Sequence, residues 1–325
     1  MTVPLLVLER FGIAFPGRGR VVPVVEDISL ALRPGEVLGM VGESGSGKSI
    51  TWQGALGLAG PGAVTSGRVL VDGRDVASAD DHTLAGLRGR RIAMIFQDPM
   101  TALNPVLTVG RQIVEALALH RGLRGQAARA EAGRLLDRVG IPGGAGRLRA
   151  YPHELSGGMC QRVMIAMALA GDPAVLIADE PTTALDATVQ AQILDLLDDI
   201  RRERGMALVL ISHDLGLVAA MADRVAVLYA GRMVEAGDAG DVLDVPRHPY
   251  TAGLLAAMPA IHGPRRRLTG IPGRVPAPGE IAGGCRFAPR CGRAAPACRA
   301  HVPALEGGSH LVACFRPMTS AEACA

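Results

Sequence analysis

The segment GESGSGKS contains the only lysine in the chain, and its residue types suit the binding of phosphate groups. Its spacing is Gly42-x-x-x-x-Gly47-Lys48-Ser49, and it follows the apolar run at 37–41. Glycines let the backbone turn so tightly that successive N–H groups point inward and can bind an anion. A helix that begins at the end of the turn adds the positive end of its dipole. The sequence therefore predicts a nucleotide site at which Lys48 contacts the β- and γ-phosphates and Ser49 binds Mg²⁺.

The type of basic residue at position 48 supports this prediction. The chain has 34 basic residues, and every one except Lys48 is arginine. A compact ammonium group on a flexible stem fits between two phosphates, whereas a planar guanidinium is broader and prefers a fork-shaped partner. The alternative is a glycine-rich turn without a ligand. The strand expected before the turn and the helix expected after it argue against that alternative.

Three further stretches contain groups that could act on a bound nucleotide. LIADEP ends an apolar strand with two carboxylates, of which Asp179 is placed to hold Mg²⁺ and Glu180 to accept a proton from an attacking water. LSGGMCQR, at 155–162, begins a helix with a Ser-Gly-Gly turn that could bind a further phosphate. ISHDL places His213 just after a strand. Each has a structural alternative: an acidic turn, an ordinary helix cap or a structural histidine.

An alternation of strands and helices must position these groups. Short apolar runs predict buried strands at residues 37–41, 91–96, 175–178 and 207–211. Apolar residues at helical spacing predict helices over 109–139, with a break near 122–125, and over 188–204. The alternation indicates an α/β fold.

Composition limits the classes of protein to be considered. Hydrophobic residues make up 49% of the chain and charged residues 20%, which is typical of a globular protein. The formal net charge is only +3, so there is no strong electrostatic attraction to nucleic acid. No apolar run approaches the roughly 20 residues that span a bilayer, and the N-terminus lacks the basic start of a secretory signal. We therefore expect a cytosolic chain that reaches membranes only through partners.

Taken in order, the motifs resemble those of the ATP-binding-cassette (ABC) ATPases over about residues 3–240. GESGSGKS resembles the Walker A motif, LSGGMCQ the signature motif and VLIADE the Walker B motif. Gln97 in FQDP is similar to the Q-loop glutamine, Asp186 in TALD to the D-loop aspartate, and His213 to the switch histidine. The resemblance implies a P-loop NTPase cassette with a RecA-like core, an antiparallel β subdomain and an inserted helical subdomain at about 98–160.

The resemblance also implies that two such cassettes pair head to tail, with each ATP between the Walker A loop of one and the signature motif of the other. The implied ATP contacts within one chain are Phe15, Gly42, Glu43, Ser44, Gly45, Ser46, Gly47, Lys48, Ser49, Thr51 and Gln97. The implied contacts to the partner's ATP are Ser156, Gly157, Gly158 and Asp186. The implied Mg²⁺ ligands are Ser49, Gln97 and Asp179. The implied catalytic residues are Lys48, Glu180 and His213.

One position departs from the family pattern. Ile50 stands where many cassettes have a threonine or serine that contacts the α-phosphate, and Thr51 is the neighbouring hydroxyl. Glu180 and His213 are both intact. We therefore expect an active ATPase and not a regulatory cassette without catalysis.

Finer stretches resemble the ATPase subunits of bacterial dipeptide and oligopeptide importers, to which the nickel importers are close relatives. They include IAMIFQDPMTALNP at 92–105 and RHPYTAGLLAAMP at 247–259. The resemblance implies a peripheral subunit at the cytoplasmic face of the inner membrane, docked on two permeases and served by an extracytoplasmic substrate-binding protein. The second ATPase would be a paralogue or another copy of this chain. The rival class is a soluble cassette acting on nucleic acid, against which the near-neutral charge argues.

The region 241–325 is expected to form a small cysteine-rich extension, because five of the six cysteines lie in its last 41 residues. Four have the spacing Cys285-x5-Cys291-x6-Cys298-x15-Cys314. These gaps are wider than those of zinc knuckles and suit a [4Fe–4S] cluster, whose four irons diverge. The resemblance to peptide-importer ATPases also favours a cluster. Zn²⁺, free thiols and disulfides are the alternatives.

Overall fold

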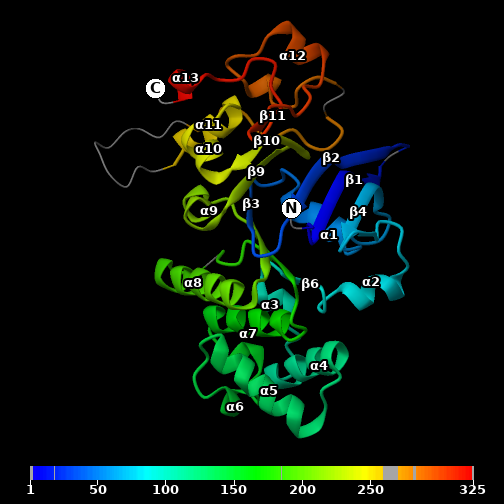
Figure 1. Ribbon diagram of the computed structural model, residues 1–325, viewed down its shortest axis with the longest axis vertical. Helices are drawn as coiled ribbons and strands as arrows, with labels where there is room; N and C mark the ends of the chain where they lie inside the picture. The colour runs from blue at the N-terminus through cyan, green and yellow to red at the C-terminus, as the bar shows by residue number, and fades with distance from the viewer. Residues whose placement is uncertain (1–2, 18, 184, 259–269, 281–282, 324–325) are drawn as a thin grey trace. The chain divides into compact units, whose positions relative to one another are not determined.

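The computed structural model describes residues 3–17, 19–183, 185–258, 270–280 and 283–323 (Figure 1). The chain forms two compact units. Unit 1 comprises Met1–Leu5, Arg33–Glu36 and Ser78–Val209. Unit 2 comprises Leu6–Leu32, Val37–Ala77 and Leu210–Ala325. Strand β8 (Ala207–Ile211) contains the point at which the chain passes from unit 1 to unit 2.

Unit 2 contains an antiparallel sheet with the strand order β2-β1-β4-β5. Its strands are β1 (Leu6–Pro16), β2 (Val21–Leu32), β4 (Val64–Val71) and β5 (Arg74–Asp75). The register pairs Leu6 with Leu32 and Leu8 with Leu30, and all four of these side chains are buried. Because side chains two residues apart point to the same face of a strand, these four leucines form one buried face of the sheet.

A second set of strands in unit 2 has the order β11-β10-β9-β3. They are β3 (Val37–Val41), β9 (Arg224–Tyr229), β10 (Arg232–Asp238) and β11 (Leu311–Val312). β3 and β9 are parallel, and the other pairs are antiparallel. Every residue of β3 is buried, as expected for a parallel strand covered on both faces. The helices of unit 2 are α1 (Lys48–Ala55), α9 (Leu215–Met221), α10 (Ala239–Asp244), α11 (Pro249–Ala256), η2 (Ala288–Arg290), α12 (Pro296–Ala300) and α13 (Ser320–Ala323).

Unit 1 contains the parallel strands β6 (Ile92–Ile95) and β7 (Val175–Asp179). Its helices are α2 (Asp81–Leu87), α3 (Pro99–Ala102), α4 (Val109–Arg121), α5 (Gly125–Arg138), α6 (Gly144–Arg147), η1 (Pro152–Glu154), α7 (Gly157–Leu169) and α8 (Ala187–Arg204). Leu117, Leu136 and Val163 are fully buried on α4, α5 and α7, which pack against one another. Helices therefore occupy the segment between β6 and β7 (Figure 1).

The predicted α/β class is confirmed, and so are the four predicted strands and both predicted helices. The break near 122–125 is where α4 ends, because Gly122 adopts the left-handed conformation that closes a helix. The sequence did not predict β11, which pairs Val312 with Glu235 of β10 and so adds a strand from the C-terminal region to the sheet. The predicted domain boundary near residue 240 stays a prediction.

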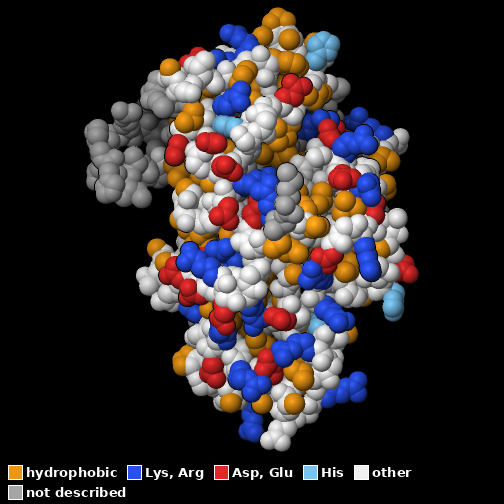
Figure 2. Space-filling model, viewed as in Figure 1, with side chains coloured by type: hydrophobic (Ala, Val, Ile, Leu, Met, Phe, Trp, Pro, Cys, Tyr) orange, Lys and Arg blue, Asp and Glu red, His pale blue; other side chains and the backbone are white. Residues whose placement is uncertain are grey.

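Two surface properties bear on possible partners. Among the described helices, none combines the length and apolar character needed to cross a membrane. On the face drawn in Figure 2, arginine side chains are interspersed with aspartate and glutamate and do not form one continuous basic area.

Candidate functional site

The Walker A loop (42–49) connects β3 to α1, and the backbone requires two of its glycines, Gly42 and Gly47. Gly42 has φ 148°, and a Cβ atom there would lie 2.2 Å from the Leu228 carbonyl oxygen. Gly47 has φ 103° and stands at the N-terminus of α1. Trp52 fixes this helix, because its fully buried indole donates a hydrogen bond to Met40 Sδ at 3.3 Å. Strand, loop and helix thus form the arrangement that a phosphate-binding loop needs.

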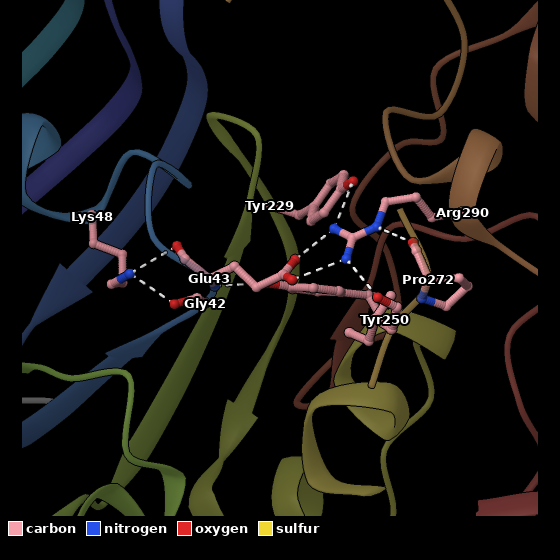
Figure 3. Close-up of polar contacts among 8 residues, drawn as sticks. Gly42, Glu43, Lys48, Tyr229, Tyr250, Pro272 and Arg290 are labelled. Carbon is pink, nitrogen blue, oxygen red and sulfur yellow. Dashed lines mark hydrogen bonds and ion pairs between the residues drawn. The ribbon is translucent and has the colours of Figure 1, made fainter. Parts of the chain in front are cut away.

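Lys48 lies over the inner side of this loop, with 5% of its surface exposed. Its Nζ donates to the Gly42 carbonyl at 2.7 Å and the Glu43 carbonyl at 3.1 Å (Figure 3). It also donates to Ser46 Oγ at 3.4 Å. These acceptors converge on a single nitrogen atom, which a compact ammonium group satisfies and a planar guanidinium does not. The positive charge is therefore held beside the backbone that would surround the phosphates.

The different surroundings of two glycines in this loop give a prediction about stability. Gly42→Ala is expected to lower the free energy of unfolding by about 3 kcal/mol or more, because it combines a glycine-only φ with a backbone clash. Gly45 has φ 78° and nothing within 4 Å of an added Cβ, so Gly45→Ala should cost only about 1 kcal/mol. Denaturant unfolding followed by the fluorescence of Trp52, the only tryptophan, measures both. Equal losses would contradict this account of Gly42.

In unit 1, Gln97 and Glu180 contact each other directly. Each stands two residues beyond the paired positions Ile95 and Ala178 of the parallel strands β6 and β7. Gln97 Nε2 donates to Glu180 Oε2 at 2.9 Å, and Thr183 Oγ1 donates to the same oxygen at 2.9 Å. The strands therefore bring a predicted Mg²⁺ ligand and the predicted general base together, although the sequence singled them out separately.

Backbone geometry also distinguishes Glu180. Its φ is +46°, an uncommon value for a residue with a side chain, and Asp179 beside it ends β7 with only 3% of its surface exposed. Such strain persists where the surroundings enforce it, and it is frequent at functional sites. It directs two adjacent carboxylates differently: Asp179 is enclosed, and Glu180 accepts the hydrogen bonds of Gln97 and Thr183.

The signature residues of unit 1 lie at the start of α7. Ser156 is its N-cap and accepts a hydrogen bond from the Met159 N–H at 3.3 Å. Ser156 and Gly157 are exposed, and a Cβ at Gly158 would lie 2.9 Å from Val189 Cγ1 of α8. Asp186, the exposed N-cap of α8, accepts from the N–H groups of Thr188 and Val189. These two helix starts are open to a partner.

The other predicted site residues of unit 2 have varied surroundings. His213 is exposed, one residue beyond Ser212, whose N–H donates to the Met40 carbonyl at 3.2 Å. Phe15 is partly exposed near the end of β1. Thr51 is fully buried on α1 and donates to the Gly47 carbonyl at 2.7 Å. Their contacts with ATP stay predictions.

The four cysteines at 285, 291, 298 and 314 line one cavity in unit 2. The Cys298 and Cys314 sulfurs each accept a backbone N–H at 3.4 Å. Burial, followed by the charges of neighbouring thiolates, raises the pKa of Cys314. All five cysteines in the described residues are free thiols. Within that part of the chain, no three His, Cys, Asp or Glu side chains are placed to hold a metal ion. The four thiols therefore gather at one cavity without forming a ready-made site for a single metal ion.

Two family models match the chain. One, described as ABC transporter, matches residues 25–183. The other, described as the C-terminal region of oligopeptide/dipeptide transporters, matches residues 234–298. A Brucella abortus (strain 2308) protein named as a peptide import ATP-binding protein is 51% identical over 94% of this chain and 93% of its own length. A Brucella ovis protein with the same kind of name is 47% identical over 93% of each.

Solved structures resemble the fold. A dimeric ATP-binding cassette bound to ADP and phosphate has a TM-score of 0.64 and 27% identity, and the match covers 72% of this chain and 98% of that one. CbiO1 of Clostridium perfringens, part of the ABC transporter complex CbiONQ, has a TM-score of 0.62 and 28% identity. The match covers 74% of this chain and 90% of CbiO1.

Proposed function

The chain belongs to the ABC transporter ATPases, and on this premise we propose that it is the ATP-hydrolysing subunit of an importer for peptides. The observation that most favours peptides is the C-terminal region, which matches the oligopeptide/dipeptide transporter model at 234–298. Relatives named as peptide import ATP-binding proteins extend over more than nine-tenths of the chain. Both observations favour peptides over nickel as the transported substrate.

The proposed hydrolysis assigns separate tasks to the two units. In unit 2, the glycine-lined loop and the buried Lys48 ammonium fit a triphosphate and would hold its β- and γ-phosphates. In unit 1, Glu180 would accept the proton of the attacking water, and its hydrogen bonds from Gln97 and Thr183 fix the direction of the carboxylate. His213, which belongs to unit 2, would steady the γ-phosphate.

The family motifs imply a magnesium ion bound with ATP, and the residues at those motif positions carry oxygen donors. The proposed ligands are the Ser49 hydroxyl, the Gln97 amide oxygen and the Asp179 carboxylate, which are the hard donors that Mg²⁺ prefers. When bound, the ion neutralises charge on the phosphates.

Head-to-tail pairing with a second ATPase subunit is part of the proposal. Its support is the exposed start of α7 at Ser156 and Gly157, together with the likeness to a dimeric cassette. Ser156, Gly157, Gly158 and Asp186 would contact the ATP of the other subunit. The assembly would lie at the cytoplasmic face of the membrane on two permeases, with an extracytoplasmic protein delivering the substrate.

Affinity purification from solubilised membranes tests this assignment. The tagged chain is expected to retain two permease subunits and a second ATPase subunit, and the Lys48→Ala variant should retain them equally because docking does not need hydrolysis. The formal net charge of only +3 and the interspersed charges on the face drawn in Figure 2 argue against a nucleic-acid partner. Stimulation of ATP hydrolysis by DNA or RNA, with no permease recovered, would overturn the proposal.

The four-cysteine site is proposed to hold a [4Fe–4S] cluster, with Zn²⁺ as the alternative. Thiolates are soft ligands that suit either, and all four thiols line one cavity. Each thiolate of a cluster binds a different iron, so the sulfurs need not converge on one ion as they do around zinc. Backbone N–H groups that donate to the Cys298 and Cys314 sulfurs would stabilise bound thiolates.

Reconstitution with iron and sulfide under anaerobic conditions tests the cysteine site. The full chain should gain a broad absorption band near the boundary of the visible and ultraviolet, and Cys291→Ser should lose it. Cys160 is the matched control, because it is fully buried in α7 and its thiol donates to the Pro152 carbonyl. Cys160→Ser should keep the band. Stoichiometric zinc without a chromophore in the purified chain would contradict the cluster.

A further inference from the structure

A short segment of the C-terminal region, residues 285–291, is docked through Phe287. The Phe287 ring lies edge-on to Tyr229 of β9, with 5.2 Å between centroids, and 5.4 Å from Tyr250 of α11. Both tyrosines are fully buried, and only 4% of Phe287 is exposed. Contacts of this kind between aromatic rings stabilise the fold by more than the buried apolar area alone would. The 285–291 segment is therefore fixed in place, with a cysteine at each end and an arginine on either side of Phe287.

Arg290 of this segment reaches directly to the Walker A loop. Its Nη1 donates to Glu43 Oε2 at 2.6 Å and its Nη2 to Glu43 Oε1 at 2.9 Å, so the pair is bidentate. The guanidinium also donates to the carbonyls of Pro272 and Ile271 and to Tyr229 Oη. These five contacts match its five N–H donors, and only 5% of the side chain is exposed. The hydrogen bonds to Glu43 raise the pKa of Arg290.

Glu43 is held through three of its groups, as Figure 3 shows. Its carboxylate accepts from Arg290, its backbone N–H donates to Tyr250 Oη at 2.7 Å, and its carbonyl accepts from Lys48 Nζ at 3.1 Å. The chain of contacts therefore runs from the cysteine-flanked segment through Arg290 and Glu43 to the lysine that would bind the phosphates.

A second contact from the same segment reaches the other side of the loop. Arg286 donates to the Ala230 carbonyl and forms an ion pair with Glu26. The neighbouring Gly231 N–H donates to the Ser46 carbonyl at 2.8 Å. Two arginines of one segment thus hold the Walker A loop, one through Glu43 and the other through the β9–β10 turn that contacts Ser46.

We propose that Arg290 is a positioning residue for ATP binding, through which the 285–291 segment sets the conformation of the Walker A loop. The inference rests on the proposed function only in taking this loop as the ATP site. Because coupling between two sites is reciprocal, ATP binding must in turn stabilise the segment.

Equilibrium binding of Mg-ATP to the purified full chain, without permeases, tests the proposal. Arg290→Ala should weaken ATP affinity by about tenfold or more, because it leaves the Glu43 carboxylate without its fork-shaped partner. Arg290→Lys, which keeps the charge and loses the fork, should lie between wild type and Arg290→Ala. Glu43→Gln should weaken binding comparably, and the double variant should be little worse than either single one.

Hydrogen exchange of residues 285–291 provides a readout that loss of stability alone would not change. ATP should slow exchange there in the wild-type chain and have no such effect in Arg290→Ala. The matched control is Arg274→Ala, which removes the ion pair between Arg274 and Glu280 in the same region. The Arg274 side chain is 79% exposed. This control should keep ATP affinity within about twofold of wild type, as expected for an exposed ion pair.

ATP affinity within twofold of wild type in Arg290→Ala, or additive effects in the double variant, would overturn the proposal. If Arg290→Ala does not fold, Arg290→Lys and Glu43→Gln decide by the same measurements. Failure of the wild-type chain to bind ATP would instead overturn the proposed function, so the two failures are distinguishable.

Discussion

Replacement of Lys48 by arginine is expected to abolish ATP hydrolysis nearly as completely as replacement by alanine. In the structure three acceptors, from Gly42, Glu43 and Ser46, surround one nitrogen atom. Only 5% of Lys48 is exposed, so a broader guanidinium has no room to lie flat in the loop. Lys48→Ala removes the charge that stabilises the transferring phosphate and Lys48→Arg displaces it from the loop, so each should reduce kcat by about 100-fold or more.

Steady-state release of phosphate measures both Lys48 variants. Arg274→Lys is the matched control, because it exchanges the same two residue types at an exposed position, and it should keep wild-type turnover. Near-normal turnover of Lys48→Arg would show that positive charge alone is sufficient at position 48.

Replacement of Glu180 by glutamine is expected to stop hydrolysis while ATP binding persists. The amide has nearly the shape of the carboxylate, and its oxygen can still accept a hydrogen bond from Thr183 or Gln97. It cannot accept the proton of an attacking water, so the rate should fall by about 100- to 10,000-fold, the usual contribution of a general base. Because the Cβ atom is unchanged, the strained φ of +46° is equally accessible to both residues.

Single-turnover hydrolysis and equilibrium ATP binding together distinguish this outcome from misfolding. Glu203→Gln is a suitable control, since Glu203 is an exposed acid of α8 that pairs with Arg138. It should hydrolyse ATP at the wild-type rate. A Glu180→Gln chain that turns over within tenfold of wild type would remove Glu180 from the proposed role of base.

Features with a local physical cause could be predicted from the sequence. The run VLGMV is apolar throughout because β3 is buried on both faces, and Gly42 and Gly47 follow it because the loop needs their φ values. Helix α8 is capped by Asp186 before its first turn and by the left-handed Gly205 after its last, and both residue types are visible in the sequence. Such signals depend on neighbouring residues alone.

Contacts between distant positions could not be predicted in this way. Arg290 and Glu43 are 247 positions apart, and in the sequence each is one charged residue among many. The Gln97–Glu180 contact depends on the parallel register of β6 and β7, which no local pattern fixes. Strand β11 has two residues, too few for any periodicity to appear. The cysteine spacing indicated that four thiols belong together, but the distances among them depend on how the intervening turns fold.

The most direct measurement of the central claim is peptide-dependent ATP hydrolysis in proteoliposomes. These would contain the chain with its co-purified permeases and second ATPase subunit, and the substrate-binding protein would be supplied with or without peptide. We predict hydrolysis that rises with the peptide-loaded binding protein and is lost in Lys48→Ala. Hydrolysis that is unaffected by peptide, binding protein and permeases would contradict the account of this chain as the ATPase of a peptide importer.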